Sequence, residues 1–395
     1  MKQSILVIFV CLAFFSCQPK QESMKVLIKD RLERSVEQSL LMVESLKDKP
    51  GKLPRTFNAK GEFITSNSDW WCSGFFPGVL WYLYEDNKSG EFLDYARRFT
   101  ALIEKEQYNK GTHDLGFMLY CSYGNGFRLT NDPSYYKILL TGAESLASRF
   151  DPVVGCIRSW DFNRQTWQYP VIIDNMMNLE YLLWASKVSG DPKYREICIS
   201  HADVTMKEHF RPDYSSYHVV SYDTITGLPE KKNTYQGLAD ETAWSRGQAW
   251  GLYGYVVMYR ETRQTRYLEH AKGIAGFMLN HPNMPADQIP YWDYDSPDIP
   301  NAKRDASAGA ITASALIELS GYVDAALAKT YLDVAEKQIR TLSSPEYFAE
   351  KGTNGNFILK SSVGSLPSNS EVDVPLTYAD YYYVEALLRY QSLIK

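Results

Sequence analysis

The feature that most constrains the fold of this chain is a regular alternation of two kinds of helical segment. Segments of the first kind carry almost no charge on any side; they are residues 74–84, 115–127, 250–259 and 308–317. Segments of the second kind place apolar residues at three- and four-residue spacing opposite a charged face; they are residues 91–106, 133–150, 193–210, 266–280 and 327–342. A helix that is apolar on every side is buried, whereas an amphipathic helix has one face in solvent. The alternation therefore predicts inner helices surrounded by outer helices.

The turns between the helices are also alike, because Asp132-Pro133 and Asp191-Pro192 each end one helix and begin the next. Uncharged segments begin near residues 74, 115, 174, 246, 308 and 378, which gives six helical hairpins if a helix near 24–46 completes the last one. We therefore expect an all-α (α/α)6 barrel, formed as a single domain by residues 51–395. Residues 17–50 would supply a polar leader and the N-terminal helix.

The first sixteen residues have the pattern of a secretory signal, in which Lys2 precedes an apolar run over residues 5–15. That run is too short to span a bilayer. Ser16-Cys17 is similar to the end of a bacterial lipobox, so we expect residues 1–16 to be removed and Cys17 to be lipidated. An ordinary cleaved signal with an incidental cysteine is the alternative. The expected product is an exported lipoprotein of a Gram-negative bacterium, in the periplasm or at the outer membrane, and attached to the membrane only by its lipid.

Composition and motifs disfavour several classes of function. The formal net charge of −5 disfavours nucleic acid as a partner, because that affinity needs a strongly basic face. The sequence has no HExxH, GxGxxG, P-loop or GxSxG pattern, so we expect no metal, no cofactor and no serine nucleophile. The aromatic content of 14% suits sugars, whose C–H faces stack on flat rings. Four cysteines lack CxxC spacing and are expected to be buried free thiols, although an exported protein can oxidise a pair: Cys72, Cys121, Cys156 and Cys198.

Acidic residues stand at the heads of several uncharged helical segments, namely Asp114, Asp174, Asp305 and Asp380. A helix N-terminus offers unpaired N–H groups and a positive potential, so each of these acids can be interpreted as a helix cap. We keep that interpretation for Asp305 and Asp380. Asp114 and Asp174 would share one rim of the barrel with several tryptophans, and apolar surroundings raise the pKa of a carboxyl group toward the range where it can donate a proton. The sequence therefore favours a functional role for this pair.

Eight segments spread over most of the chain carry a family resemblance. In order they are DWWCSGFFPGVLW (69–81), HDLGF (113–117), RSWD (158–161), VIIDNMMNLE (171–180), SSYHVV (215–220), WSRGQAWGLYGY (244–255), YWDYDSPDIPNAKRDASA (291–308) and EVDVPLTYADYYYVEALLRY (371–390). Together they resemble glycoside hydrolase family 88, the unsaturated glucuronyl hydrolases. The resemblance implies an (α/α)6 barrel, in agreement with the alternation of helices.

The resemblance also implies a substrate and a reaction. Members of the family act on short oligosaccharides left by polysaccharide lyases, whose non-reducing uronate has a double bond between C4 and C5. A proton is added to C4 and water to C5 of this enol ether, and the hemiketal then rearranges and expels the rest of the sugar. Asp174 would be the general acid and base, and Asp114 would hold sugar hydroxyls and support the electrostatics of the site. This pair would differ from the acid and nucleophile of ordinary glycosidases.

Further residues match family positions near the substrate. The resemblance implies polar contacts from His113, His218, Arg246 and Gln248, and stacking on Trp71, Trp160 and Trp250. The substrate carboxylate needs a cation, because a buried unpaired anion is costly, and Arg246 is expected to supply it. Two plainer interpretations remain open, in which Arg246 forms a structural ion pair and His218 is a core residue with satisfied hydrogen bonds.

The loop before residue 371 bears on sulfate recognition. Family members that accept sulfated glycosaminoglycan fragments have a Ser-x-x-Ser-x-Lys pattern there. Ser365 and Ser368 match this pattern, but Ser370 replaces the lysine. The two serines could still donate hydrogen bonds to a sulfate, while the missing cation argues against a sulfate preference. A plain polar loop is the alternative.

Three rival functions share parts of this pattern. An unsaturated rhamnogalacturonyl hydrolase would use the same barrel and chemistry on pectin fragments. A sugar 2-epimerase also has an α/α barrel, but it relies on paired histidines as bases, and only His218 is in a matching position. A non-catalytic sugar-binding lipoprotein would have no need for an acid in an apolar helix mouth.

Overall fold

The computed structural model describes residues 22–58 and 60–394. The predicted signal, residues 1–16, and the predicted lipidation site Cys17 lie outside the described residues. Within the described ranges, no helix combines the length and the apolar character needed to cross a membrane.

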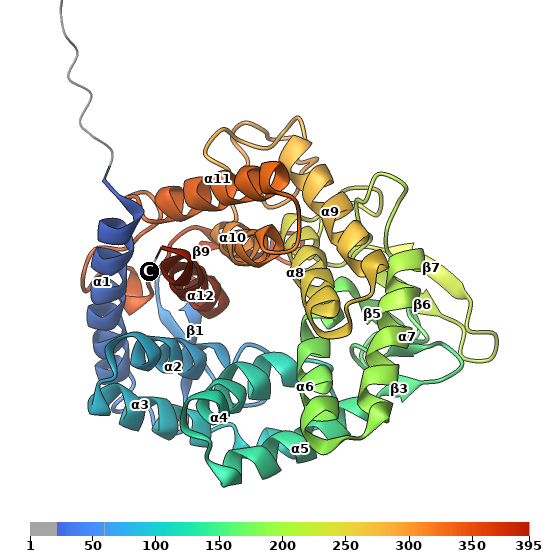
Figure 1. Cartoon of the computed structure of the whole chain (residues 1–395), viewed down its shortest axis with the longest axis horizontal. Coiled ribbons are helices and arrows are strands. Elements are labelled where there is room, and N and C mark those ends of the chain that lie inside the picture. Colours follow the sequence, from blue (N-terminus) through green and yellow to red (C-terminus); the bar gives the residue numbers. More distant parts are fainter. Residues whose placement is uncertain (1–21, 59, 395) are drawn as a thin grey trace, which may run out of the picture.

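The helices form two concentric rings (Figure 1). The inner ring consists of α2 (Phe75–Asn87), the π-helix η2 (Gly116–Gly124) with α4 (Asn125–Thr130), the 3-10 helix η3 (Ile173–Asn178) with α6 (Leu179–Ser189), α8 (Ser245–Thr262), α10 (Ala306–Ser320) and α12 (Thr377–Leu393). The outer ring consists of α1 (Met24–Ser45), α3 (Gly90–Ala101), α5 (Pro133–Ala147), α7 (Pro192–Glu208), α9 (Thr265–Asn280) and α11 (Ala325–Leu342). Two short 3-10 helices lie in connections: η1 (Glu104–Tyr108) and η4 (Asn354–Asn356). The predicted (α/α)6 barrel is confirmed.

Burial along the helices follows the two sequence patterns. Every residue of α8 from Ser245 to Met258 is buried, and so is every residue of α10 from Ala306 to Ile317. By contrast, α11 buries a single stripe at helical spacing, made of Tyr331, Ala335, Gln338, Ile339 and Leu342. The uncharged segments are thus the inner helices, and the amphipathic segments are the outer ones.

Aspartates cap several helices, and one prediction about them fails. Asp132 and Asp191 accept hydrogen bonds from the first turns of α5 and α7, with proline at the start of each helix, so the Asp-Pro turns are confirmed. Asp305 caps α10 through Ser307 N and Ala308 N, as predicted. Asp380 is not a cap, because it lies inside the first turn of α12. Its carboxylate instead accepts hydrogen bonds from two backbone N–H groups, those of residues 358 and 359.

The N-terminal helix α1 closes the ring by packing against α12 and α2 (Figure 1). Gln38 on α1 is buried, and its side-chain amide donates to the carbonyls of Thr353 and Phe357, while its oxygen accepts from Gly352 N. The expectation that a helix near 24–46 completes the last hairpin is therefore confirmed.

Short antiparallel sheets, which the sequence analysis did not predict, lie in the connections. The pairs are β1 (Leu53–Phe57) with β2 (Phe63–Ser66), β3 (Phe150–Asp151) with β4 (Cys156–Ile157), and β8 (Ser362–Ser365) with β9 (Ser370–Val374). A three-stranded sheet has the order β5 (Pro170–Ile172), β6 (Val219–Tyr222), β7 (Pro229–Asn233). Because β5 leads directly into η3 and β9 precedes α12, these sheets gather where inner helices begin.

All four cysteines within the described ranges, Cys72, Cys121, Cys156 and Cys198, are buried and unpaired. Burial raises the pKa of each thiol, which keeps it protonated and unreactive. The expectation of buried free thiols is confirmed for these residues.

Replacing Gln38 with Ala tests whether α1 is an integral part of the barrel. The variant would remove three hydrogen bonds, of which only the one to the Phe357 carbonyl is buried, so we expect a loss of about 1–3 kcal/mol in the free energy of unfolding. The measurement is urea denaturation followed by circular dichroism. Glu37→Ala, which removes only an exposed pair with Lys351, is the matched control and should change stability by less than about 1 kcal/mol. Equal effects of the two variants would contradict the proposed role of Gln38.

Candidate active site

Asp174 is placed by the junction of β5 and η3 at the mouth of the barrel. The backbone N–H of Ile173 donates to the carbonyl of His218 at 3.0 Å, which fixes the start of η3 against the strand β6. Asp174 is in the first turn of this 3-10 helix, and only 7% of the residue is exposed. Its side chain makes no capping hydrogen bond, so interpreting Asp174 as a helix cap is wrong.

Asp114 occupies the corresponding place before η2. Its carboxylate accepts a hydrogen bond from Thr112 Oγ1 at 2.6 Å, and His113 Nε2 lies 3.3 Å from its other oxygen. The Asp114 side chain does not cap η2, so the cap interpretation fails here as well. Burial lowers the pKa of His113, which is therefore a neutral neighbour of Asp114 rather than a cation.

A close contact between η2 and η3 brings the two acids together. A Cβ atom on Gly116 would lie only 2.5 Å from Asn178 Oδ1, so no larger residue fits there without a shift. The same oxygen of Asn178 accepts a hydrogen bond from Phe117 N at 3.2 Å. The helix starts that carry Asp114 and Asp174 are thereby locked against each other.

The environment of Asp174 changes its acidity. Burial raises the pKa of its carboxyl group from 3.8 to about 7, the positive charge of Arg246 opposes this rise, and the negative charge of Asp114 adds to it. One carboxyl oxygen, Oδ2, is buried and makes no hydrogen bond to any described residue. A carboxyl group with this pKa can donate a proton near neutral pH and take one back.

His218 faces Asp174 as a neutral hydrogen-bond donor. Its Nδ1 atom accepts hydrogen bonds from Tyr235 N at 3.0 Å and Gln236 N at 3.1 Å, which assigns the proton to Nε2. That Nε2 atom lies 3.7 Å from Asp174 Oδ2 and has no hydrogen-bond partner among the described residues. Burial, together with the charge of Arg246, holds the pKa of His218 well below its usual value. His218 is therefore at the site, and its Nε2 makes none of the hydrogen bonds expected of a satisfied core residue.

Arg246 forms the structural ion pair that the sequence left open. Its Nη1 atom lies 3.1 Å from Asp305 Oδ2 and also contacts the carbonyl of Val363, while Nη2 donates to the carbonyl of Gly364 at 2.6 Å. The guanidinium is buried, and its central carbon lies 4.3 Å from the centre of the Trp244 ring. Only Nε has no partner within the described part of the chain. Arg246 thus joins α8, α10 and the β8–β9 hairpin.

Two residues predicted to contact the substrate, Gln248 and Trp250, have internal neighbours in this structure. Both polar atoms of the Gln248 amide are used internally, since Oε1 accepts from Ser216 N at 2.6 Å and Nε2 donates to the carbonyl of Tyr214 at 3.1 Å. Trp250 is fully buried between Phe117 and Tyr382, so neither of its faces can stack on a sugar. Its indole N–H instead lies near Asp174 and opposes the rise in that residue's pKa, although the two groups do not meet the geometry of a hydrogen bond.

The other predicted contacts lie in the walls of the mouth. Trp71 is half-buried against Phe117 and Tyr378, and Trp160 is half-buried with its ring centre 6.3 Å from that of His218. Ser365 and Ser368 are hydrogen-bonded to each other at 3.0 Å at the turn end of the β8–β9 hairpin, which Arg246 holds through the carbonyls of residues 363 and 364.

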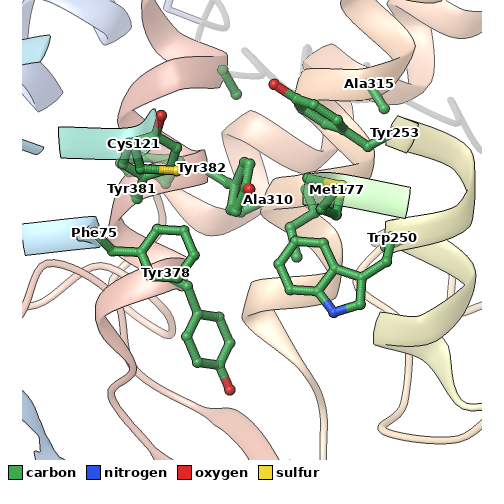
Figure 2. Close-up of a cluster of buried hydrophobic side chains, with 14 of the residues drawn as sticks. Phe75, Cys121, Met177, Trp250, Tyr253, Ala310, Ala315, Tyr378, Tyr381 and Tyr382 are labelled. Atoms are coloured by element: carbon green, nitrogen blue, oxygen red, sulfur yellow. The ribbon is translucent and has the colours of Figure 1, made fainter. Parts of the chain in front are cut away.

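Eight buried polar side-chain atoms at this mouth have no partner among the described residues. Buried polar groups normally have partners, so a group of such atoms around Asp174 is typical of a ligand-binding site. Sequence reasoning missed two of its members, Trp244 and Tyr378, although both lie within matched segments. Figure 2 shows the Tyr378 hydroxyl and the Trp250 indole nitrogen pointing to the same side of the aromatic cluster. The unpartnered atoms at the mouth are His113 Nδ1, Trp160 Nε1, Asp174 Oδ2, His218 Nε2, Trp244 Nε1, Arg246 Nε, Trp250 Nε1 and Tyr378 OH.

A separate cavity of about 540 Å³ lies at the other end of the barrel, toward the C-terminal ends of the inner helices. Tyr253, Tyr382, Glu385 and Arg389 are among its lining residues, and Asp114 and Asp174 are not. Glu385 in its wall is fully satisfied by Tyr82, Tyr253 and Ser314. This cavity does not share the chemistry of the mouth.

Comparison with known proteins gives consistent matches. The model of Glycosyl Hydrolase Family 88 matches residues 51–392. An unsaturated glucuronyl hydrolase from Formosa agariphila is 47% identical over 82% of this chain and 80% of that protein. The crystal structure of an unsaturated glucuronyl hydrolase specific for heparin superposes with a TM-score of 0.91 and 50% identity, over 94% of this chain and 98% of that one. An unsaturated chondroitin disaccharide hydrolase from Streptococcus agalactiae is 29% identical over 93% of this chain and 92% of that protein.

Replacing Asp174 with Asn tests the cost of burying its carboxyl group. The pKa of about 7 in the folded state exceeds the usual 3.8, so the folded protein keeps a proton that the unfolded chain loses between these values. The resulting stabilisation is complete at low pH and is lost as the pH rises through about 7. We therefore expect Asp174→Asn to melt at a higher temperature than the wild type at pH 8, with a smaller difference at pH 4, in differential scanning calorimetry. A lower melting temperature at pH 8 would contradict the assigned burial.

Proposed function

This chain belongs to Glycosyl Hydrolase Family 88, and we propose that it removes the 4,5-unsaturated uronate from the non-reducing end of lyase-generated glycosaminoglycan oligosaccharides. The observation that carries the proposal is Asp174, a buried carboxyl group with a pKa of about 7 and an unpartnered oxygen, facing the neutral His218. This is a hydrolase of the unsaturated glucuronyl type, and the roles of its residues follow from the geometry of the mouth.

Protonation of the double bond is the first chemical step. Asp174 gives its proton to C4 of the unsaturated ring, and the ring oxygen stabilises the positive charge that develops at C5. The site keeps Asp174 protonated near neutral pH by burying it and by placing the charge of Asp114 nearby. Asp114, oriented by Thr112, is available to accept hydrogen bonds from sugar hydroxyls.

Addition of water completes the reaction. The carboxylate left on Asp174 takes a proton from water as the oxygen bonds to C5, which regenerates the acid. The product is a hemiketal, whose ring opens to a ketone at C5 and leaves C1 as a hemiacetal that still carries the leaving sugar. As C1 becomes an aldehyde, the proton of its hydroxyl goes to the leaving sugar. The bond from C1 to the leaving sugar then breaks, so one water is consumed and one sugar is released. The His218 Nε2–H group, 3.7 Å from Asp174, is placed to hold this water or a ring hydroxyl.

The substrate carboxylate requires donors in an otherwise apolar mouth. Arg246 Nε and the Tyr378 hydroxyl are both without partners, and the guanidinium carbon lies 5.4 Å from the centre of the Tyr378 ring. We assign these two groups to the uronate carboxylate. The ion pair with Asp305 keeps the guanidinium in place, which reconciles its structural role with the predicted contact to substrate.

The preferred substrate is a heparin-type disaccharide. The relative that is 50% identical is specific for heparin, whereas those described as unsaturated chondroitin disaccharide hydrolases are 29–32% identical. Ser370 stands where family members that accept sulfated glycosaminoglycan fragments have a lysine, so a sulfate group on this substrate would need a different cation.

The cellular location is part of the proposal. A signal in residues 1–16 with lipidated Cys17 would place the enzyme in the periplasm or at the outer membrane, where exported lyases release their fragments. Mass spectrometry of the mature N-terminus would support this if Cys17 carries lipid, and an unmodified N-terminus would overturn it.

The direct test follows the ultraviolet absorbance of the conjugated C4=C5 bond with unsaturated disaccharides from heparin, chondroitin, hyaluronan and pectin lyase digests. Loss of absorbance fastest with heparin disaccharides supports the proposal. Fastest loss with pectin fragments would favour an unsaturated rhamnogalacturonyl hydrolase, and no loss with any disaccharide would favour a sugar-binding protein without catalysis.

Asp174→Asn should lower kcat by about a thousandfold or more, because the amide cannot donate the proton in the same way. In the wild type, kcat/KM should fall as the pH rises above about 7, since the acid must be protonated to act. Both are measured by the absorbance assay. Near-normal turnover by the variant would remove Asp174 from the mechanism.

Tyr378→Phe should raise KM about 5- to 50-fold with a smaller change in kcat, because it removes one hydrogen bond to a charged group. Steady-state kinetics on the best disaccharide provide the measurement. Tyr294→Phe is the matched control, since that hydroxyl is also buried and unpartnered but its ring packs against Phe277 and His281, away from the mouth. If the two variants behave alike, Tyr378 does not bind the carboxylate.

A further inference from the structure

Two large aromatic side chains are exposed beside the mouth of the site. Phe162 is 46% exposed and Tyr235 is 40% exposed. Phe162 is stacked on Trp160 at 4.7 Å between ring centres, with the planes 20° apart, and the Tyr235 ring lies 5.7 Å from that of Trp160 and 5.8 Å from that of Phe162. The three rings form one cluster, which we call the aromatic lip. Exposed apolar rings in a group are a common sign of a binding surface.

The aromatic lip is tied directly to the reacting groups. The backbone N–H of Tyr235 donates to His218 Nδ1, and His218 Nε2 faces Asp174. Trp160 is also held close to the start of η3. The hydroxyl of its neighbour Ser159 accepts a hydrogen bond from the backbone N–H of Ile172, the residue directly before η3. Trp160 is therefore near the unsaturated uronate, and Phe162 and Tyr235 are the next rings outward.

A group of cations surrounds the base of the lip. Asp161 lies 3.0 Å from Arg149, 2.8 Å from Arg158 and 3.0 Å from Arg164, so one carboxylate balances three guanidinium groups. Arg149 is buried, but the Arg164 side chain is 52% exposed. The exposed Lys231 joins them by donating to the carbonyl of Thr166. The loop that carries Phe162 thus has an excess of positive charge, although the whole chain is acidic.

We propose that the aromatic lip and Arg164 form the subsite for the second sugar of the substrate, a sulfated amino sugar that stacks on Phe162 and Tyr235. This inference rests on the proposed function, which places the unsaturated uronate at Asp174. The chemistry occurs within the uronate ring, so the leaving sugar lies outside the catalytic groups, and the aromatic lip is an exposed surface directly beside them. Flat aromatic rings suit the C–H face of this sugar. The uncompensated positive charge of the arginines suits a sulfate group, because Ser370 stands in place of the lysine that would otherwise supply a cation. Selectivity for the leaving sugar would then come from residues 160–164 and Tyr235, outside the catalytic groups.

The test uses the full-length mature protein with two unsaturated heparin disaccharides, one N- and 6-O-sulfated and one N-acetylated without sulfate. Phe162→Ala and Tyr235→Ala should each raise KM about 3- to 10-fold for both disaccharides, with kcat changed by less than about twofold. Phe162→Tyr, which keeps the ring, should restore the wild-type KM. Arg164→Gln should raise KM about 3- to 10-fold for the sulfated disaccharide and leave the other unchanged. Ile225→Ala, in the β6–β7 turn and 84% exposed, is the control for removing a surface side chain.

Binding without turnover separates this inference from the proposed function. Isothermal titration calorimetry on Asp174→Asn, alone and combined with Phe162→Ala or Arg164→Gln, measures affinity for the same disaccharides. A weaker Kd in the combined variants supports the subsite even if the wild type hydrolyses neither disaccharide. An unchanged KM and Kd for Phe162→Ala and Tyr235→Ala overturns it, and so does an equal effect of Arg164→Gln on both disaccharides.

Discussion

The burial of Asp174 without a charge partner is the constraint on which the chemistry of this protein depends. A buried carboxyl group costs less free energy when it has an ionic or hydrogen-bonding partner, and other buried acids of this barrel have one. Asp305 is paired with Arg246, and Glu385 accepts hydrogen bonds from three hydroxyl groups. Asp174 has neither, and the imidazole of His218 that faces it is kept neutral by burial. An acid that can release and recover a proton has to be held in this unsatisfied state.

An elevated pKa alone does not identify such a group. Burial also raises the pKa of Asp380 to about 7, yet both of its oxygens accept backbone N–H groups and fix the loop before β8. The two carboxyl groups differ in whether their oxygens have hydrogen-bond partners. Asp380 has a full set of partners, whereas Asp174 Oδ2 lies among several other unpartnered atoms at the mouth. The inner helices create this contrast, because their first turns converge on the mouth while their sides are packed against one another.

The sequence predicts the barrel well, because charge and apolar periodicity report directly on burial in helices. It favours a role for the acid pair because Asp114 and Asp174 stand at the heads of uncharged segments. It fails where the role of a side chain depends on contacts between distant segments. Gln248 and Trp250 lie in a matched motif, but their partners come from residues 214–216 and from α12, so only the fold reveals that they are internal. The short sheets were missed because strands of two to five residues carry little periodic signal.

Arg246 shows how one residue can couple acidity to substrate selection. Its charge counteracts the rise in the pKa of Asp174, and its terminal nitrogens bind the carbonyls of Val363 and Gly364 in the hairpin that carries Ser365 and Ser368. Gln236, next to Tyr235, also donates to the Gly364 carbonyl, at 3.3 Å. The hairpin and the loop that carries Tyr235 therefore meet at one carbonyl. A change in either loop that moved this carbonyl would shift the guanidinium, and with it the proton affinity of the acid, so the specificity loops of this enzyme cannot vary independently of its catalytic centre.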